Sequence, residues 1–170
     1  MNGNSHLRSK YKRTSWFYDI LDYPWERQYQ KWRPEILKNV SGRVLEAGVG
    51  TGHNLRHYSP SVNLTAIDLS SGMLRQAHKR TRKAQCKVDL KEADATNLKQ
   101  FVDGIFDWYI STFMYCVMPD RLQPIALREM ARVLKSGGKF RLIEILYSKN
   151  RSLRLRQKLL VPFVEFVYGA

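Results

Sequence analysis

The sequence predicts a single α/β domain with a Rossmann-like, doubly wound and mainly parallel sheet that carries helices on both faces. Three observations support this fold class. The strand-like residues Val44-Leu45 run straight into a glycine-rich stretch at 48–52. A second buried strand follows and ends at Asp68, about 20 residues beyond the glycines, an order typical of nucleotide-binding folds. Further apolar stretches then alternate with helical patterns, as expected for parallel strands joined by helices.

Length and composition fit one domain without a membrane span. The chain has 170 residues, 44% of them hydrophobic, which is enough for one core. No apolar run reaches the roughly 20 residues that cross a bilayer, and the polar, basic amino terminus lacks the apolar part of a signal peptide, so we expect a cytoplasmic location. Cys86 and Cys116 form no Cys-x-x-Cys pair, so neither a disulfide framework nor a metal site is expected.

The charge balance is strongly basic. Lys and Arg number 29 against 15 Asp and Glu, a formal net charge of +14, which favours an anionic partner such as nucleic acid or an acidic membrane surface. The cations concentrate at 8–13, at 75–91 and at 149–158. The ordinary alternative for each cluster is a solvated face, so the charge alone does not choose the partner.

The chain ahead of the first strand has two parts. Residues 1–13 carry charges, Gly, Asn and Ser without an apolar period, which predicts a flexible basic arm. Residues 14–40 are rich in aromatic side chains and are interrupted by Pro24 and Pro34, which predicts two or three short helices. Because exposing so many aromatic rings to water is costly, we expect most of them to cover the sheet or a ligand pocket.

The glycine-rich stretch predicts a cofactor site. Glycine allows a tight turn in which backbone approaches a ligand, and the helix that follows offers free N–H groups. A dinucleotide site uses Gly-x-Gly-x-x-Gly, but here the spacing is Gly48-x-Gly50-x-Gly52 and Glu46 precedes it. An acid at this point would repel a pyrophosphate but suits an ammonium or sulfonium group. Nicotinamide binding is therefore the less favoured interpretation, and an ordinary tight turn is the remaining alternative.

Residues 44–52, Val-Leu-Glu-Ala-Gly-Val-Gly-Thr-Gly, resemble the first motif of the class I S-adenosylmethionine-dependent methyltransferases. The resemblance implies that Glu46, Gly48, Gly50 and Gly52 lie at S-adenosylmethionine or its product S-adenosylhomocysteine. Asp68 would accept hydrogen bonds from the ribose hydroxyls.

The second motif follows the second strand. Residues 68–73, Asp-Leu-Ser-Ser-Gly-Met, resemble it and imply that Leu69 contacts the cofactor and that Met73 lies under the adenine; a core methionine is the alternative for Met73. Ser70 or Ser71 is expected to cap a helix that continues through Lys83.

A short helix is predicted between the two motifs, over 53–58, and is closed by Ser59-Pro60-Ser61. His53 at its start is a candidate base on the pocket rim, although the positive helix end lowers its basicity.

The third and fourth strands complete the predicted cofactor site. A third strand at 86–90 precedes Asp94 and Ala95, which the resemblance places at the adenine edge; an acid that caps a turn is the alternative. The fourth strand and its exit at 106–117 carry Ser111 and Tyr115, where cofactor and acceptor should meet, since ligands gather outside the carboxyl ends of strands.

The fourth strand also argues against modification of nucleobases. Amine methyltransferases for bases typically carry Asn/Asp-Pro-Pro-Tyr/Phe here, but this chain has Ser111-Thr112-Phe113-Met114. The Pro-Cys nucleophile of RNA 5-methylcytosine enzymes is missing too, so a base substrate is disfavoured despite the basic charge.

The next helix and strand indicate the branch of the family. A helix is predicted at 120–134, a glycine stop at 135–139 and a fifth strand at 140–145. Residues 127–138 resemble the branch that methylates quinones, phospholipid amines and other small molecules. The resemblance covers about residues 14–146 and implies lid helices at 14–40, a cofactor-binding core at 41–146 and a sheet that apparently lacks the last two strands, all in one domain over 14–170.

The final stretch, 147–170, joins a basic run to an apolar one. Arg151, Arg154, Arg156 and Lys158 lead into the apolar residues 159–168. This composition suits an interfacial membrane element, and the alternative is a helix that packs beside the sheet.

The resemblance predicts a methyltransferase for a small or lipophilic acceptor, with a phospholipid amine at a membrane surface favoured. Tyr18, in a Tyr-Asp pair typical of the lid, would lie near the cofactor, and Tyr18, His53 and Tyr115 are the candidates for removing a proton from an amine. The alternatives are a quinone C-methyltransferase, or a cofactor-binding but inactive module for nucleic acid or another partner. Nucleic acid is the less favoured partner, and a homo-oligomer is left open.

Overall fold

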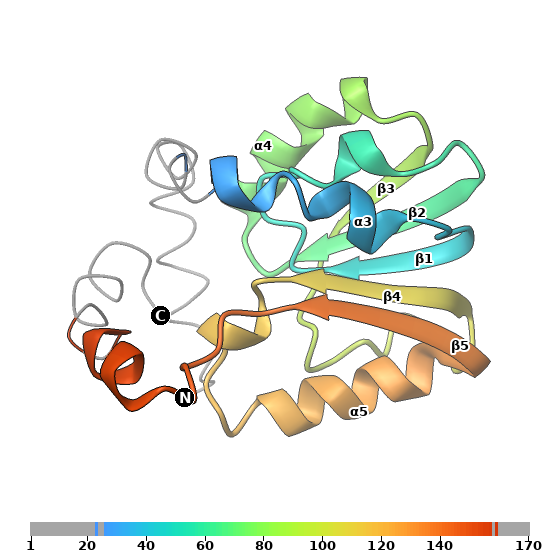
Figure 1. The fold of residues 1–170 in the computed structure, drawn as a ribbon. Coiled ribbons are helices and arrows are strands. Elements are labelled where there is room, and N and C mark those ends of the chain that lie inside the picture. Colours follow the sequence, from blue (N-terminus) through green and yellow to red (C-terminus); the bar gives the residue numbers. More distant parts are fainter. Residues whose placement is uncertain (1–22, 24–25, 158, 160–170) are drawn as a thin grey trace.

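A five-stranded parallel sheet forms the centre of the structure, a computed structural model that describes residues 23, 26–157 and 159 (Figure 1). The strand order is β3-β2-β1-β4-β5, and every neighbouring pair is parallel. The strands are β1 (Gly42–Ala47), β2 (Val62–Asp68), β3 (Lys87–Glu92), β4 (Phe106–Thr112) and β5 (Leu134–Ile143). The predicted doubly wound, parallel fold is confirmed. The chain order reverses between β1 and β4, and ligands bind at such a reversal in open α/β sheets.

Helices cover both faces of the sheet (Figure 1). The labelled α-helices are α3 (Arg33–Leu37), α4 (Ser71–Arg80) and α5 (Gln123–Val133), and the short 3-10 helices are η1 (Leu55–His57), η2 (Thr81–Lys83) and η3 (Tyr115–Val117). Residues 26–29 and 151–157 are helical as well. Apolar residues of α3, η1 and α4 belong to one core cluster, and those of α5 belong to a second cluster. Side chains alternate between these two clusters along each central strand: Val44 belongs to the first and Leu45 to the second.

Two predicted helices are shorter than expected. The helix predicted over 53–58 is only the three-residue η1, since Pro60 in the closing turn prevents its extension. The helix predicted through Lys83 ends at Arg80, and η2 completes the run. Ser70 is the N-cap of α4: the Ser70 hydroxyl accepts a hydrogen bond from the backbone N–H of Met73 at 3.4 Å.

The predicted glycine stop at 135–139 is part of β5. Leu134 already pairs with Phe106, and the register then shifts so that Lys139 pairs with Trp108. Gly137, at φ +75°, lies in this irregular stretch. The strand therefore starts earlier and ends earlier, at Ile143, than the predicted 140–145.

Several predicted features lie outside the described residues. These are the basic arm at 1–13, Tyr18 and most of the lid ahead of residue 26, and Lys158 with 160–170. Within the described part of the chain, no helix is long and apolar enough to cross a membrane. The same part holds no group of three or more His, Cys, Asp or Glu side chains that could bind a metal ion, and both cysteines are free thiols.

Candidate functional site

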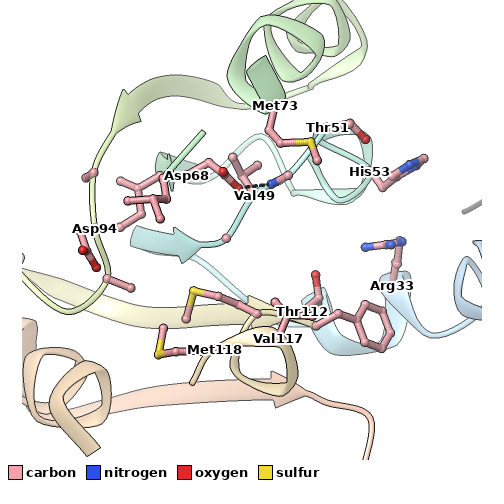
Figure 2. A pocket seen from close by; sticks show the side chains of 18 residues that line it. Arg33, Val49, Thr51, His53, Asp68, Met73, Asp94, Thr112, Val117 and Met118 are labelled. Carbon is pink, nitrogen blue, oxygen red and sulfur yellow. Dashed lines mark hydrogen bonds between the residues drawn. The ribbon is translucent and has the colours of Figure 1, made fainter. Parts of the chain in front are cut away.

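A cavity of about 160 Å³ opens at the carboxyl ends of the strands, beside the point where the strand order reverses (Figure 2). Its lining comes from several elements: Gly48, Val49, Gly50, Thr51 and His53 after β1; Ile67, Asp68, Leu69 and Met73 at β2 and α4; Ala93, Asp94 and Ala95 after β3; Thr112, Phe113, Met114, Val117 and Met118 at and after β4; and Arg33. In Figure 2, Asp68 and Asp94 lie toward one end of the cavity, and His53 and Arg33 lie toward the other.

The glycine loop needs its glycines for conformation and for space. Gly48 and Gly50 have φ values of +74° and +54°, and the backbone N–H of Gly48 donates to the Ile67 carbonyl at 2.9 Å. A Cβ on Gly48 would lie 2.8 Å from Cβ of Met114. Gly52 also has a positive φ, +88°, and a Cβ there would lie 3.1 Å from Cα of Ala77 in α4. Unlike Gly48 and Gly50, it does not line the cavity.

Asp68 both lines the cavity and holds the glycine loop. One carboxylate oxygen accepts from the backbone N–H of Gly50 at 2.8 Å, and the other accepts from the N–H of Ser70 at 2.9 Å. Burial raises the pKa of Asp68 to about 6, and the hydrogen bonds from Ser70 and Gly50 act in the opposite direction. Because a carboxylate has about four acceptor positions, Asp68 can still accept from ribose hydroxyls. Its predicted neighbours Leu69 and Met73 also line the cavity.

Glu46 is not at the cavity surface. Its side chain is fully buried behind the glycine loop, where it accepts from the Asn54 amide at 2.7 Å and from the Tyr58 hydroxyl at 3.0 Å. Burial raises the pKa of Glu46 to about 7, against the effect of these two hydrogen bonds. Its placement differs from the expectation because successive side chains in β1 alternate between faces, and Glu46 lies on the face of Val44.

Arg33 of α3 was missed by the sequence reasoning. It is buried but lines the cavity, and its guanidinium donates to both carboxylate oxygens of Glu26, at 2.9 and 2.6 Å, and to the side-chain Oδ1 of Asn54 at 2.7 Å. Asn54 in turn donates to Glu46, so a continuous hydrogen-bond network runs from the half-buried Glu26 through Arg33 and Asn54 to the fully buried Glu46. The sequence offers no clear signal for it, because residues 14–40 contain four cations, Arg27, Lys31, Arg33 and Lys38, and their spacing does not single out Arg33.

The three candidate bases are separated by the structure. His53 lines the cavity at its rim, with Nδ1 3.4 Å from a Glu26 oxygen. Tyr115 points into the second core cluster instead, where its hydroxyl lies 3.3 Å from that of Tyr109, and burial raises its pKa. A phenol with a raised pKa in the core is unsuited to accept a proton from a ligand in the cavity, so the expectation for Tyr115 is corrected. Tyr18 lies outside the described residues.

Of the other residues predicted to contact the cofactor, two line the cavity and one does not. Asp94 and Ala95 line the cavity, and one Asp94 oxygen also accepts from the backbone N–H of Thr96 at 2.8 Å, so the acid caps a turn as well. Ser111 is fully buried and does not line the cavity, and its hydroxyl has no hydrogen-bond partner among the described residues. Its position inside β4, one residue before the strand end, keeps it in the core.

An apolar wall closes the cavity on the β4 side. It consists of Phe113, Met114, Val117 and Met118, all from the loop after β4. Phe113 has φ +60°, a conformation that costs about 1 kcal/mol or more outside glycine.

Two side chains hold this loop in place. The Glu144 carboxylate accepts from the backbone N–H groups of Tyr115 and Cys116 at 3.1 and 2.9 Å. The Gln123 amide donates to the carbonyls of Tyr115 and Met118 at 3.1 and 3.2 Å. Sequence reasoning missed both residues, because their partners are backbone groups that no side-chain motif reveals.

The arrangement suits a polar, nucleoside-like ligand that lies beside a second, apolar ligand. Carboxylates that can accept from hydroxyl and amine groups lie at one end, and an arginine lies at the other. The wall of aromatic, methionine and valine side chains offers no charge, and methionines adapt to ligands of irregular shape. The site therefore fits a charged nucleoside cofactor and a largely apolar reactant.

Known proteins with similar sequences are named as methyltransferases. A sequence family described as a methyltransferase domain matches residues 44–138, more than half of the chain. The phosphatidylethanolamine N-methyltransferase of Cereibacter sphaeroides is 35% identical over 149 residues, 85% of this chain and 72% of that protein. The demethylmenaquinone methyltransferase of Staphylococcus haemolyticus (strain JCSC1435) is 30% identical over 172 residues, 96% of this chain and 68% of that protein. The chain thus spans only part of each relative.

Among solved structures, the DhpI–SAM–HEP complex resembles the chain in fold. Its TM-score is 0.73 at 21% sequence identity, over 93% of this chain and 73% of that one. At this level of identity the similarity concerns the fold alone.

Proposed function

The chain belongs to the methyltransferase domain family, and from this membership we propose that it transfers a methyl group from S-adenosylmethionine to a lipophilic small molecule, with a phospholipid amine as the favoured acceptor. The observation that carries the proposal is the cavity at the chain reversal, with acids at one end and an apolar wall beside them. The curated relatives support the small-molecule class. A membrane surface as the place of reaction is part of the proposal.

The residues present fit S-adenosylmethionine. Asp68 would accept from the ribose hydroxyls, and Asp94 with the backbone N–H of Ala95 would meet the adenine edge. Met73 would lie against the adenine ring, and the glycines allow the backbone to come close to the ligand. Arg33 remains for the charged amino-acid part at the other end of the cavity. Glu46, behind the loop, would act on the sulfonium through space and not by contact.

The protein's own task in methyl transfer is alignment and exclusion of water. S-adenosylmethionine supplies an electrophilic methyl group, so the nucleophile needs mainly to be held in line with the carbon–sulfur bond. The wall of Phe113, Met114, Val117 and Met118 would hold the apolar part of the acceptor. An amine acceptor must also lose a proton, and His53, which lies near Glu26, is the candidate base among the described residues.

A quinone carbon is the second candidate acceptor. The relative named demethylmenaquinone methyltransferase aligns with 96% of this chain, and an isoprenoid quinone would also suit an apolar wall. The phospholipid amine is preferred because the sequence identity is higher for the relative of that name.

The test supplies S-adenosylmethionine with a labelled methyl group and a bacterial lipid extract supplemented with demethylated quinone. Mass spectrometry of the products should place the label on phosphatidylethanolamine. Label on the quinone alone would establish the second candidate instead. Tight binding of S-adenosylhomocysteine without any labelled product would favour an inactive binding module, and failure to bind it would remove the proposal.

A further inference from the structure

The segment 145–157, named here the basic apolar segment, exposes large apolar side chains. Ile145, Leu146, Tyr147, Leu153 and Leu155 are each at least 50% exposed, and Leu146 reaches 78%. Scattered exposed apolar residues are normal on a protein surface, but a succession within so short a stretch marks a contact surface.

The same segment is purely cationic. Lys149, Arg151, Arg154 and Arg156 are all exposed, and no Asp or Glu occurs between 145 and 157. A partner that matches this segment must therefore offer apolar surface and negative charge together.

The segment is folded on itself, and Arg154 contributes to this by donating to the carbonyls of Ser148 and Lys149 at 2.9 and 3.2 Å. The other cations and the apolar side chains are exposed. The Gln157 side chain accepts from the backbone N–H of Ser148 at 2.7 Å and donates to the Leu146 carbonyl at 3.3 Å. Asn150 accepts from the N–H groups of Ser152 and Leu153 at 3.0 and 3.2 Å, which caps the helical residues 151–157. The exposed surface thus has a defined shape, and none of the described residues covers it, so little ordering remains to be done on binding.

The position of the segment relates it to the cavity. It follows β5 and lies beyond the carboxyl ends of the strands, the same end at which the cavity opens (Figure 1). Glu144, the residue directly before the segment, holds the loop that forms the apolar wall. A surface bound by the segment would therefore lie close to the cavity.

We propose that the basic apolar segment docks on an anionic lipid bilayer, with its leucines in the headgroup boundary and its arginines on lipid phosphates. RNA would match the cations, but exposed leucine and isoleucine have no favourable partner on a phosphate backbone. Docking on a bilayer does not depend on the proposed function. The inference rests on that function only in explaining what docking achieves, which is to bring a lipid acceptor to the cavity.

Vesicle flotation with the full chain tests the proposal, using phosphatidylcholine vesicles with and without phosphatidylglycerol. Two double variants change the segment, R151Q/R156Q and L153S/L155S. Matched controls change the same chemistry elsewhere: R82Q/K83Q removes two exposed cations of η2, and Val102→Ser removes an apolar side chain that is 68% exposed. We expect the charge variant to bind anionic vesicles about 30-fold more weakly. The leucine variant should lose at least tenfold, and both controls should bind as the unchanged protein does.

Equal losses in segment and control variants would overturn the proposal, since the general charge of the protein would then explain binding. It would also be overturned if the segment variants abolished self-association or salt-sensitive RNA binding but left vesicle binding unchanged. Calorimetry with S-adenosylhomocysteine separates this result from the proposed function. A variant that binds the cofactor product normally but not vesicles supports the docking surface, whatever the methyl acceptor proves to be.

Discussion

Replacing Glu46 with glutamine should remove a pH dependence from the stability of the protein. The Glu46 carboxyl is fully buried and accepts from Asn54 and Tyr58. A glutamine has the same shape: its carbonyl can accept from Asn54, and its amide can donate to the Tyr58 oxygen. The substitution therefore keeps the geometry and removes only the titrating group.

The size of the effect follows from the pKa of Glu46, which burial raises from 4.5 to about 7 in the folded protein. The folded state then binds the proton more tightly than the unfolded state, so this stabilisation is complete below pH 4.5 and is lost as the pH rises through 7. The total is about 3 kcal/mol, and about 2.5 kcal/mol of it falls between pH 5 and pH 8. Burial also raises the pKa of Asp68, to about 6, so Asp68 adds a loss of stability with rising pH that occurs in the unchanged protein and in Glu46→Gln alike.

Urea unfolding at pH 5 and pH 8 measures the difference. The free energy of unfolding of the unchanged protein should fall between the two pH values by about 2 to 3 kcal/mol more than that of Glu46→Gln. An equal fall in both proteins would refute the reasoning, because Glu46 would then have the same pKa folded and unfolded.

Three further substitutions test the site. Glu144→Gln keeps one oxygen to accept from two backbone N–H groups, so it should loosen the apolar wall. We expect KM for the methyl acceptor to rise about tenfold while the affinity for S-adenosylhomocysteine stays unchanged. An equal loss of both affinities would contradict a role confined to the wall. Gly48→Ala meets Met114 at a positive φ and should lower the free energy of unfolding by about 2 kcal/mol, as urea unfolding would report; wild-type stability would mean that the wall moves freely. His53→Asn should lower kcat for an amine acceptor about 100-fold below pH 8 without changing cofactor affinity; an unchanged pH–rate profile would exclude His53 as the base.

The part of the cavity that we assign to the cofactor was largely predictable, because the residues that form it are close to the strand ends in sequence. Strand ends, glycine spacing and an acid at the next strand end place Gly48, Gly50 and Asp68 together in any parallel sheet of this kind. Asp94 and Ala95 follow from the same geometry at the third strand, since they come directly after β3.

The rest depended on orientations that spacing does not reveal. Arg33 and Asn54 are 21 residues apart and meet only because α3 and η1 pack on the same face of the sheet. Because Tyr115 follows β4, the sequence predicts it near the ligand, but η3 turns its ring into the core. The resemblance gave Glu46 a direct role at the cofactor, while strand alternation places it behind the loop.

The central claim is that this cavity binds S-adenosylmethionine and passes its methyl group to a lipid. The most direct measurement is transfer of a labelled methyl group to phosphatidylethanolamine in anionic vesicles, for the unchanged protein, for Asp68→Ala and for the exposed control Asp89→Asn. We predict labelled lipid with the unchanged protein and the control, and a rate at least 100-fold lower with Asp68→Ala, which loses the ribose contact and a hydrogen bond to the glycine loop. Equal rates for Asp68→Ala and the unchanged protein would contradict the account.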